Sequence, residues 1–275
     1  WSDELLQLFD IDKKLLPSCP AVQSSYGTLM DTGIPISTVS GDQSAALFSQ
    51  GEIPEDTAIV NLGTGAFILA PCKATVQTDT LLQGIARSNG RTEYLLEGTV
   101  NGAGAAISWA QQLWPVTELY RHLPGWLDAI EQPPIFINTV GGLGSPWWVS
   151  DIEPYFLDED KHLNIEHRYV AIIESIIFLL QHNIQQLNRH LDIRTLRVSG
   201  GLSQMDVLCQ KLADLSGCHV QRFADTEATA RGAAWLATDE PENCSSQAPC
   251  RCFTPAPQNS LKRRYQCFTE EISRF

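Results

Sequence analysis

The strongest pattern of apolar and polar positions lies in residues 166–191. Apolar side chains recur there every three or four positions, which is the spacing of one face of a helix. We therefore predict a long, buried helix in this segment. Its apolar series is Ile173, Ile176, Ile177, Leu180, Ile184, Leu187 and Leu191. Weaker patterns predict shorter helices at residues 43–50, 100–113, 204–215, 228–237 and 261–272.

Short apolar runs bounded by glycine predict two β-hairpins. Residues 57–62 and 66–70 flank Gly63-Thr64-Gly65, and residues 84–88 and 92–96 flank Asn89-Gly90. Asn-Gly between two apolar runs is the strongest short-range hairpin signal. Three further strands are expected at residues 35–39, 196–198 and 218–221.

Strands and helices alternate in the second half of the chain, which predicts an α/β domain with a largely parallel sheet. The first 38 residues contain several prolines and read as a loop, and residues 240–257 read as a linker. The run 169–180 contains Glu174 and is too short to span a membrane. The chain begins at Trp1, without an initiator methionine, which indicates a fragment.

Composition and charge narrow the class of partner. The chain has 275 residues, 43% of them hydrophobic, a formal net charge of -13 and a pI near 4.8. A surface this acidic argues against nucleic-acid or membrane partners. It is compatible with phosphate binding, because backbone N–H groups at turns and helix N-termini bind anions locally.

The cysteines predict free thiols and a cytoplasmic location. The chain has eight cysteines, and the first four show no compact spacing. The last four form a C-x5-C-x-C-x14-C pattern that matches no familiar zinc site, so we expect no metal site here. These four are Cys244, Cys250, Cys252 and Cys267.

Asp42 immediately precedes the helix predicted at residues 43–50, and two roles are open to it. It is either the N-cap of that helix or a general base that accepts a hydroxyl proton. On local physics alone the N-cap is favoured. A carboxylate between a strand and a helix also lies where α/β folds place their ligands.

Two glycine turns are candidates for a phosphate or nucleotide site. Gly63-Thr64-Gly65 is a tight turn in which backbone N–H groups and a hydroxyl are able to approach a phosphate. Gly200-Gly201 leaves a flat surface on which a purine or ribose fits, with Gly102 and Gly104 on the facing wall. Each turn is also explained by backbone conformation alone.

Five segments in order give the sequence its specificity, because together they resemble the FGGY family of carbohydrate kinases. The resemblance runs from about residue 5 to residue 237. The segments are GDQSAALFSQG (41–51), NLGTGAF (61–67), LLEGTVNGAGAAISWAQQL (95–113), INTVGGLGSPWW (137–148) and the long motif at 198–237 that contains VSGGLS and TEATARGAA.

The resemblance implies an α/β chain with the actin/hexokinase-like (ribonuclease H-like) fold, here the C-terminal lobe of a two-lobe kinase. It implies ATP and Mg²⁺ as cofactors and a sugar or polyol as substrate. It divides the chain into the end of the N-terminal lobe with the GDQ segment (1–52), a nucleotide-binding lobe (53–240) and a C-terminal loop and helix (241–275). The rest of the N-terminal lobe is the expected partner, and a homodimer is left open.

The resemblance also assigns residues. Asp42 is implied as the catalytic base, and Gln43 and Phe67 as substrate-binding residues beside it. Implied nucleotide-binding residues are Gly63, Thr64, Gly65, Gly104, Ser108, Gly201, Leu202 and Met205.

Two of these positions depart from the family pattern: Met205 stands where asparagine is usual, and Ser108 where glutamine is common. The family's Asp-x-Gly-x-(Thr/Ser) phosphate loop and acidic Mg²⁺ ligand are not in this sequence.

Two other classes of function are alternatives to a carbohydrate kinase. One is a kinase remnant that binds nucleotide or sugar without catalysis, which the sequence does not distinguish from an enzyme. The other is a chaperone-type ATPase of the same fold, which the GDQ segment and the x-G-L-G-x-P-x-W motif disfavour. Trp147 and Trp148 are expected to anchor a loop in the core rather than to stack on a sugar.

Overall fold

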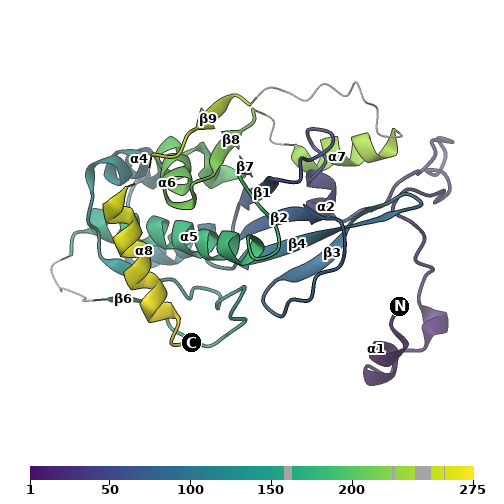
Figure 1. The fold of residues 1–275 in the computed structure, drawn as a ribbon, viewed down its shortest axis with the longest axis horizontal. Helices are drawn as coiled ribbons and strands as arrows, with labels where there is room; N and C mark the ends of the chain where they lie inside the picture. Colours follow the sequence, from purple (N-terminus) through teal and green to yellow (C-terminus); the bar gives the residue numbers. More distant parts are fainter. Residues whose placement is uncertain (158–162, 225–226, 239–248, 257) are drawn as a thin grey trace.

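The structure, a computed structural model, describes the chain except for residues 158–162, 225–226, 239–248 and 257. Its centre is a seven-stranded sheet in the order β3-β4-β2-β1-β7-β8-β9 (Figure 1). The strands are β1 (Thr57–Leu62), β2 (Ala66–Cys72), β3 (Leu82–Ser88), β4 (Thr92–Val100), β7 (Thr195–Ser199), β8 (His219–Arg222) and β9 (Arg251–Phe253). A separate pair joins β5 (Ile135–Ile137) to β6 (Tyr155–Leu157).

The sheet is mixed, so the prediction of a largely parallel sheet is wrong. Strand β1 pairs in parallel with β7, and β7 with β8. The pairs β1–β2, β2–β4, β3–β4 and β8–β9 are antiparallel. The predicted turns at 63–65 and 89–90 explain this, because a strand that returns through a tight turn must pair antiparallel.

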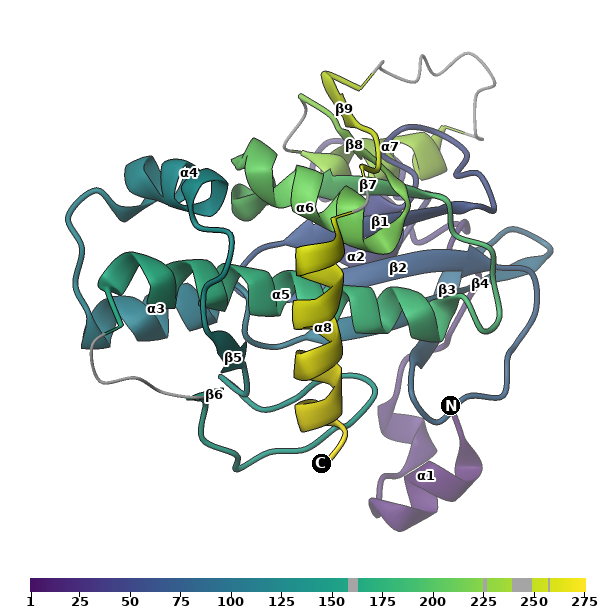
Figure 2. The ribbon, with the colours of Figure 1, turned by 60° about the vertical axis from the view of Figure 1, so that its left-hand side comes forward.

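Helices cover both faces of the sheet. Helix α5 (Ile165–Leu187) crosses one face and is buried on nearly every side, beneath α3 (Gly104–Leu113), α4 (Leu119–Ala129), α6 (Asp206–Ser216) and α8 (Asn259–Ile272) (Figure 2). The opposite face carries α2 (Asp42–Ala46) and α7 (Ala228–Ala237). Short helices α1 (Asp3–Leu8), η1 (Lys13–Leu15) and η2 (Gly201–Gln204) complete the set.

Alternating side chains of the strands feed two separate cores. Leu62, Ile68 and Leu96 belong to the large core around α5. Ile59 and Leu69, which point to the other face, pack in a small core with α2 and α7. This second face of the sheet carries the part of the candidate site that contains Asp42.

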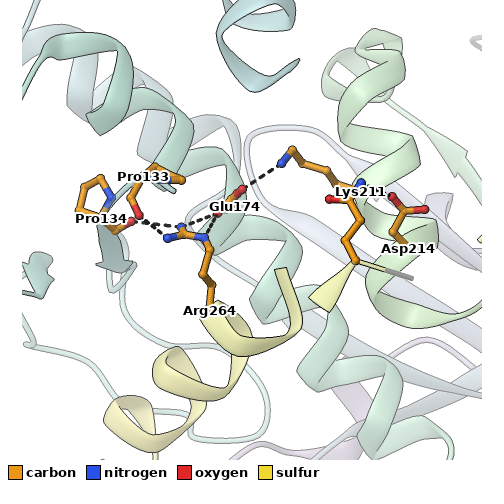
Figure 3. A network of polar contacts seen from close by, with 7 residues as sticks. Pro133, Pro134, Glu174, Lys211, Asp214 and Arg264 are labelled. Carbon is orange, nitrogen blue, oxygen red and sulfur yellow. Dashed lines mark hydrogen bonds and ion pairs between the residues drawn. The ribbon is translucent and has the colours of Figure 1, made fainter. Parts of the chain in front are cut away.

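Glu174, the charged residue within the apolar run, is explained by an ion-pair network (Figure 3). Its side chain is 1% exposed and pairs with Lys211 of α6 at 3.1 Å and with the Nε of Arg264 of α8 at 2.9 Å. Arg264 also donates to the carbonyls of Pro133 and Pro134. The network therefore fastens α6 and α8 to the central helix, since a buried charge requires partners.

Several predicted elements differ from the observed ones. Residues 35–39 form isolated bridges, Thr28 with Pro35 and Gln23 with Thr38, rather than a strand. Helix α3 begins at Gly104 instead of residue 100, because Val100 still pairs with Ala66 in the sheet. Helix α4 and strands β5, β6 and β9 were not predicted, and β9 lies within the expected linker, whose residues 240–248 and 257 are outside the described residues.

Trp147 lies half-buried against His182, with 4.6 Å between ring centroids, whereas Trp148 is 44% exposed. The expected anchoring therefore applies to Trp147 alone. Each described cysteine is a free thiol, and Cys244 lies outside the described residues. In the described part of the chain no helix has both the length and the apolar character to cross a membrane.

Candidate functional site

Asp42 is the first residue of α2, and the N-cap position belongs to Gly41. The N-cap interpretation of Asp42 is therefore wrong by one position. Its Oδ1 accepts a hydrogen bond from the amide of Gln43 at 2.8 Å, and the side chain is exposed. The carboxylate is thus oriented by its own helix and still open to a ligand.

Asp42 faces a cavity of about 490 Å³ between α2, α7 and the β1–β2 hairpin. Predicted residues that line this cavity are Asp42, Gln43, Gly63, Thr64, Gly65 and Phe67. Lining residues that the sequence analysis assigned no role are Asn61, Ser199, Glu227 and Thr229. Glu227 and Thr229 do fall within the TEATARGAA motif, so the motif was the available signal.

Gln43 shows an unmet need for a hydrogen-bond donor. Its Oε1 atom is buried and accepts no hydrogen bond within the described residues. A buried polar atom without a partner is costly, and in native proteins a water or a ligand supplies one. Gln43 lines the same cavity as Asp42, so its Oε1 atom can accept a hydrogen bond from a hydroxyl group bound there.

A second acid, Glu97 of β4, lies near Asp42. It pairs with Leu69 across β2 and β4 and therefore faces the same side of the sheet as the cavity floor. Burial raises the pKa of Glu97; the Thr99 hydroxyl, which hydrogen-bonds the carboxyl, opposes this rise, and the Asp42 carboxylate adds to it. A second carboxyl group thus lies close enough to Asp42 for the two to interact electrostatically.

The Gly63–Gly65 turn is held by its own backbone and by the start of α3. Gly63 N donates to Gly65 O at 2.9 Å, and the amides of Gly104 and Ala105 donate to the carbonyls of Gly63 and Thr64 at 3.0 and 2.9 Å. The Thr64 and Gly65 amides donate to no carbonyl of the described residues. Two free amides and the exposed Thr64 hydroxyl form a group of donors suited to a phosphate.

A second cavity, about 530 Å³, lies on the other side of this turn. Predicted nucleotide-binding residues that line it are Gly63, Thr64, Gly104, Ser108, Gly201, Leu202 and Met205. Gly63 and Thr64 are therefore shared by both cavities. Gly65 lines only the first cavity.

The two glycines of the Gly200-Gly201 turn line different cavities, Gly200 the first and Gly201 the second, and they are glycine for different physical reasons. Gly200 has φ +88°, and a Cβ there would lie 2.6 Å from the carbonyl oxygen of Leu62. Gly201 has no atom within 4 Å of its Cβ position, which leaves the flat surface that was expected. Gly102 does not line the cavity, because its neighbourhood is filled by Asn138, whose Nδ2 donates to Gly102 O at 2.7 Å.

The sequence analysis did not predict the residues that form the remaining wall of the second cavity. Tyr120 and Pro124 of α4 and Gln204 of η2 complete it. Tyr120 and Pro124 are four residues apart and so share one face of α4, a helix that the sequence patterns did not predict. An aromatic ring and a proline facing a glycine surface make a flat slot for a planar group.

Charge is unevenly distributed over the two cavities. The second is lined by uncharged residues, and the first by the acids Asp42 and Glu227 without a basic residue among its lining. No group of three His, Cys, Asp or Glu side chains in the described segments is arranged to hold a metal ion. This part of the chain thus offers neutral donors to a phosphate, but no cation and no built Mg²⁺ site.

A larger cavity, of about 780 Å³, lies at the opposite end of the sheet. Asp56, Cys72 and Arg194 are among its lining residues, and it contains no predicted site residue. The size of a cavity therefore does not identify the site. We identify it by the predicted residues, which converge on the two cavities around the Gly63–Gly65 turn.

Comparison with known proteins identifies the type of molecule to which this arrangement belongs. The sequence profile of the C-terminal domain of the FGGY family of carbohydrate kinases matches residues 58–238. Glycerol kinase from Thermococcus kodakarensis is 31% identical over 290 residues, covering 100% of this chain and 58% of the relative. Glycerol kinase 1 from Clostridium tetani is 36% identical over 252 residues, covering 86% and 50%.

Solved structures show the same fold. Plasmodium falciparum glycerol kinase with ADP has a TM-score of 0.87 at 23% identity, covering 100% of this chain and 59% of that one. Xylulose kinase from Lactobacillus acidophilus has a TM-score of 0.86 at 19% identity, covering 100% and 60%. The fold is thus the actin/hexokinase-like one, and the chain spans about half the length of the curated relatives it matches.

Proposed function

Since the chain belongs to the FGGY family of carbohydrate kinases, we propose that it is the C-terminal lobe of an enzyme that transfers a phosphate from ATP to a hydroxyl of a sugar or polyol. The first substrate to test is glycerol, because relatives that are 31% and 36% identical are glycerol kinases. Residues 1–52 are then the end of the N-terminal lobe with the GDQ segment, residues 53–240 the nucleotide-binding lobe, and residues 241–275 a C-terminal loop and helix.

The observation that carries the proposal is the shared turn. Gly63 and Thr64 line both cavities, so a group bound by the Thr64 and Gly65 donors lies between them. A phosphoryl transfer needs this order: nucleotide, transferred phosphate, acceptor hydroxyl. The neutral slot bounded by Gly201, Met205 and Tyr120 is the proposed nucleotide side.

On the acceptor side, Asp42 is placed to take the proton of the attacking hydroxyl. Gln43 Oε1 accepts a hydrogen bond from a substrate hydroxyl, and Phe67 packs against the carbon skeleton. These three side chains orient the acceptor before reaction, which is the main contribution that a protein makes to phosphoryl transfer. The described residues of this chain are suited to bind ATP, but they do not suffice to bind Mg²⁺.

The second cavity fits the adenosine part of ATP, because it has a flat glycine surface, an aromatic ring and no charge. Mg²⁺ would neutralise phosphate charge when bound, but among the described residues no group of three His, Cys, Asp or Glu side chains is arranged to hold it. We therefore assign the Mg²⁺ ligands and the basic groups to the upstream half that the relatives' greater length provides.

Exposed apolar side chains support an upstream partner lobe. In the first 39 residues Leu8 is 72% exposed, Phe9 66%, Leu15 80% and Met30 84%. Figure 1 shows α1 standing away from the body of the molecule. Large apolar side chains exposed in this number along one segment are typical of a region that another domain covers.

The test is Asp42→Asn in the enzyme that includes the upstream half. Phosphorylation of glycerol should fall about 10²- to 10⁴-fold, the usual contribution of a positioned base. The dissociation constant for ATP should stay within about twofold, because Asp42 lies outside the nucleotide cavity. Asp128→Asn, an exposed carboxylate that lines neither cavity, is the control.

Two results would contradict the proposal. One is ATP binding without phosphorylation of glycerol or of any sugar or polyol in a panel, which would indicate a nucleotide-binding remnant. The other is full activity of Asp42→Asn, which would leave the base unassigned.

A further inference from the structure

Helices α2 and α7 are packed so closely that their backbones touch. A Cβ atom at Gly232 of α7 would lie 1.7 Å from the carbonyl oxygen of Ala45 and 2.6 Å from its carbonyl carbon. No side chain fits in that space, so this crossing requires glycine at position 232. Gly232 is buried.

Other contacts extend this crossing beyond the end of α2. Trp235 stacks on Phe48 with 5.2 Å between centroids and 6° between ring planes. The Nε of Arg231 donates to the carbonyl oxygen of Ser49 at 3.1 Å. The segment that follows α2 is therefore also packed against α7.

At the other end of α2, Thr229 of α7 contacts Asp42, the proposed base. Its Oγ1 donates to the main-chain oxygen of Asp42 at 3.2 Å. Helix α2 has five residues and no side-chain cap at Gly41. A helix this short is not stable by itself, so neighbouring elements decide where Asp42 lies.

The sheet supplies a second support. Ser44 Oγ donates to the carbonyl oxygen of Ile85 in β3 at 3.1 Å. Helix α2 is thus held between α7 above and β3 below. Thr229 is the residue of α7 that hydrogen-bonds Asp42, through the main-chain oxygen of Asp42.

We propose that Thr229 and Gly232 are positioning residues for Asp42, and that α7 acts on the base through them. The inference rests on the proposed function, in which Asp42 is the base. Neither residue is required to touch the reacting atoms: Gly232 sets the distance between the helices, and Thr229 fixes the first residue of α2. Displacing a catalytic group by about 1 Å costs on the order of 10²-fold in rate, so small shifts of α2 matter.

The position of α7 makes the effect selective. Residues of α7 line the cavity that contains Asp42, but none of them lines the nucleotide cavity. Loosening α7 should therefore reduce turnover and leave ATP binding intact. A purely structural role would reduce both together.

The experiment compares Thr229→Val with Thr229→Ser. Valine keeps the shape and removes the donor, whereas serine keeps the hydroxyl. In the enzyme with its upstream half, Thr229→Val should lower kcat for the alcohol about 5-fold, the effect of losing one hydrogen bond. KM for ATP should stay within about twofold, and Thr229→Ser should restore kcat to within about twofold of the unmodified enzyme.

Amide hydrogen exchange in the 275-residue chain gives a readout that needs no turnover. Thr229→Val should speed exchange of the amides of Ala45 and Phe48, which bond within this segment, by about 5-fold, and Thr229→Ser should not. Gly232→Ala, which removes the close approach, should have the larger effect on both readouts in protein that still folds.

Each outcome decides a separate point. Unchanged exchange in Thr229→Val overturns the claim that α7 holds α2, whatever the kinase assay shows. Faster exchange with unchanged kcat overturns the link to catalysis. An enzyme without any phosphotransfer overturns the proposed function instead, and the exchange data still decide whether α7 fixes the position of α2.

Discussion

Burial alters the ionisation of side chains on both faces of the sheet. It raises the pKa of Glu97 beside the candidate base, lowers the pKa of Arg197 and lowers that of His182 to about 4. In each case loss of hydration disfavours the charged form. Arg197 also has buried Nε and Nη1 atoms without a partner among the described residues. Electrostatic cost from burial is thus present on both faces of the sheet, at Glu97 and Arg197 on one and at His182 of α5 on the other.

His182 predicts an acid-sensitive step in stability. Its pKa is lowered from 6.5 to about 4, mainly by burial and further by Arg189. Because the unfolded state then takes up the proton first, its contribution is complete above pH 6.5 and is lost as the pH falls towards 4. The full loss is about 3 kcal/mol, the free energy of a shift of about 2.5 pH units.

The measurement is urea unfolding of His182→Phe and the unmodified chain at several pH values. Phenylalanine keeps a ring against Trp147. The free energy of unfolding should fall less steeply between pH 6.5 and 4 in the variant, and His190→Phe, at an exposed position, should leave the slope unchanged. Equal slopes in all three proteins would show that His182 protonates without penalty.

The elements that sequence patterns predicted well are those whose signal is local. The long apolar series gave α5 almost to its ends, and Gly63–Gly65 and Asn89-Gly90 gave both hairpins. The three-residue strands β5, β6 and β9 were missed because their partners, not their own residues, define them. Helix α4 was missed because Pro124 lies inside it. That miss removed one wall of the nucleotide cavity from the prediction.

Gly104, the first residue of α3, contacts the Gly63–Gly65 turn. Its substitution tests whether this contact holds the turn in place. A Cβ there would lie 2.8 Å from the carbonyl oxygen of Gly63, which the Gly104 amide bonds at 3.0 Å. Gly104→Ala should therefore displace the Gly63–Gly65 turn. We expect the dissociation constant for ATP to rise at least about 10-fold, corresponding to 1.4 kcal/mol or more of lost binding.

Gly125→Ala is the matched control, because its Cβ would meet no atom within 4 Å in the middle of α4. That substitution should leave ATP binding unchanged and raise stability by about 0.5–1 kcal/mol, the difference in helix propensity. Isothermal titration with ATP measures the first effect and thermal unfolding the second. Equal ATP affinity in both variants would mean that the turn does not contact the nucleotide.

Local sequence patterns could not predict which residues come together to form the site. The four residues Asp42, Gly63, Gly104 and Gly201 are spread over about 160 residues of sequence, and the fold brings them to the two cavities on either side of the Gly63–Gly65 turn. The resemblance to a family supplied that juxtaposition, whereas the alternation of strands and helices led to the prediction of a largely parallel sheet, which is wrong. The periodicity reports which face a residue occupies, not which strand lies beside it.

The uneven charge of the two cavities predicts the behaviour of the 275-residue chain on its own. It should bind ATP weakly, near the millimolar range, because only neutral donors face the phosphates. It should show no phosphorylation of glycerol or other polyols until the upstream half is supplied. Robust turnover by the chain alone would require a cation site that the described residues do not contain, and would overturn the division into two lobes.

The turn shared by the two cavities has a consequence for inhibition. Gly63 and Thr64 separate the cavities by the thickness of a backbone turn, so one molecule can occupy both at once. An adenosine joined through a short phosphate chain to a polyol would lose its translational freedom once and gain the contacts of two ligands. The optimum linker length for such a bisubstrate compound would measure, in solution, how far apart the donor and acceptor groups are held.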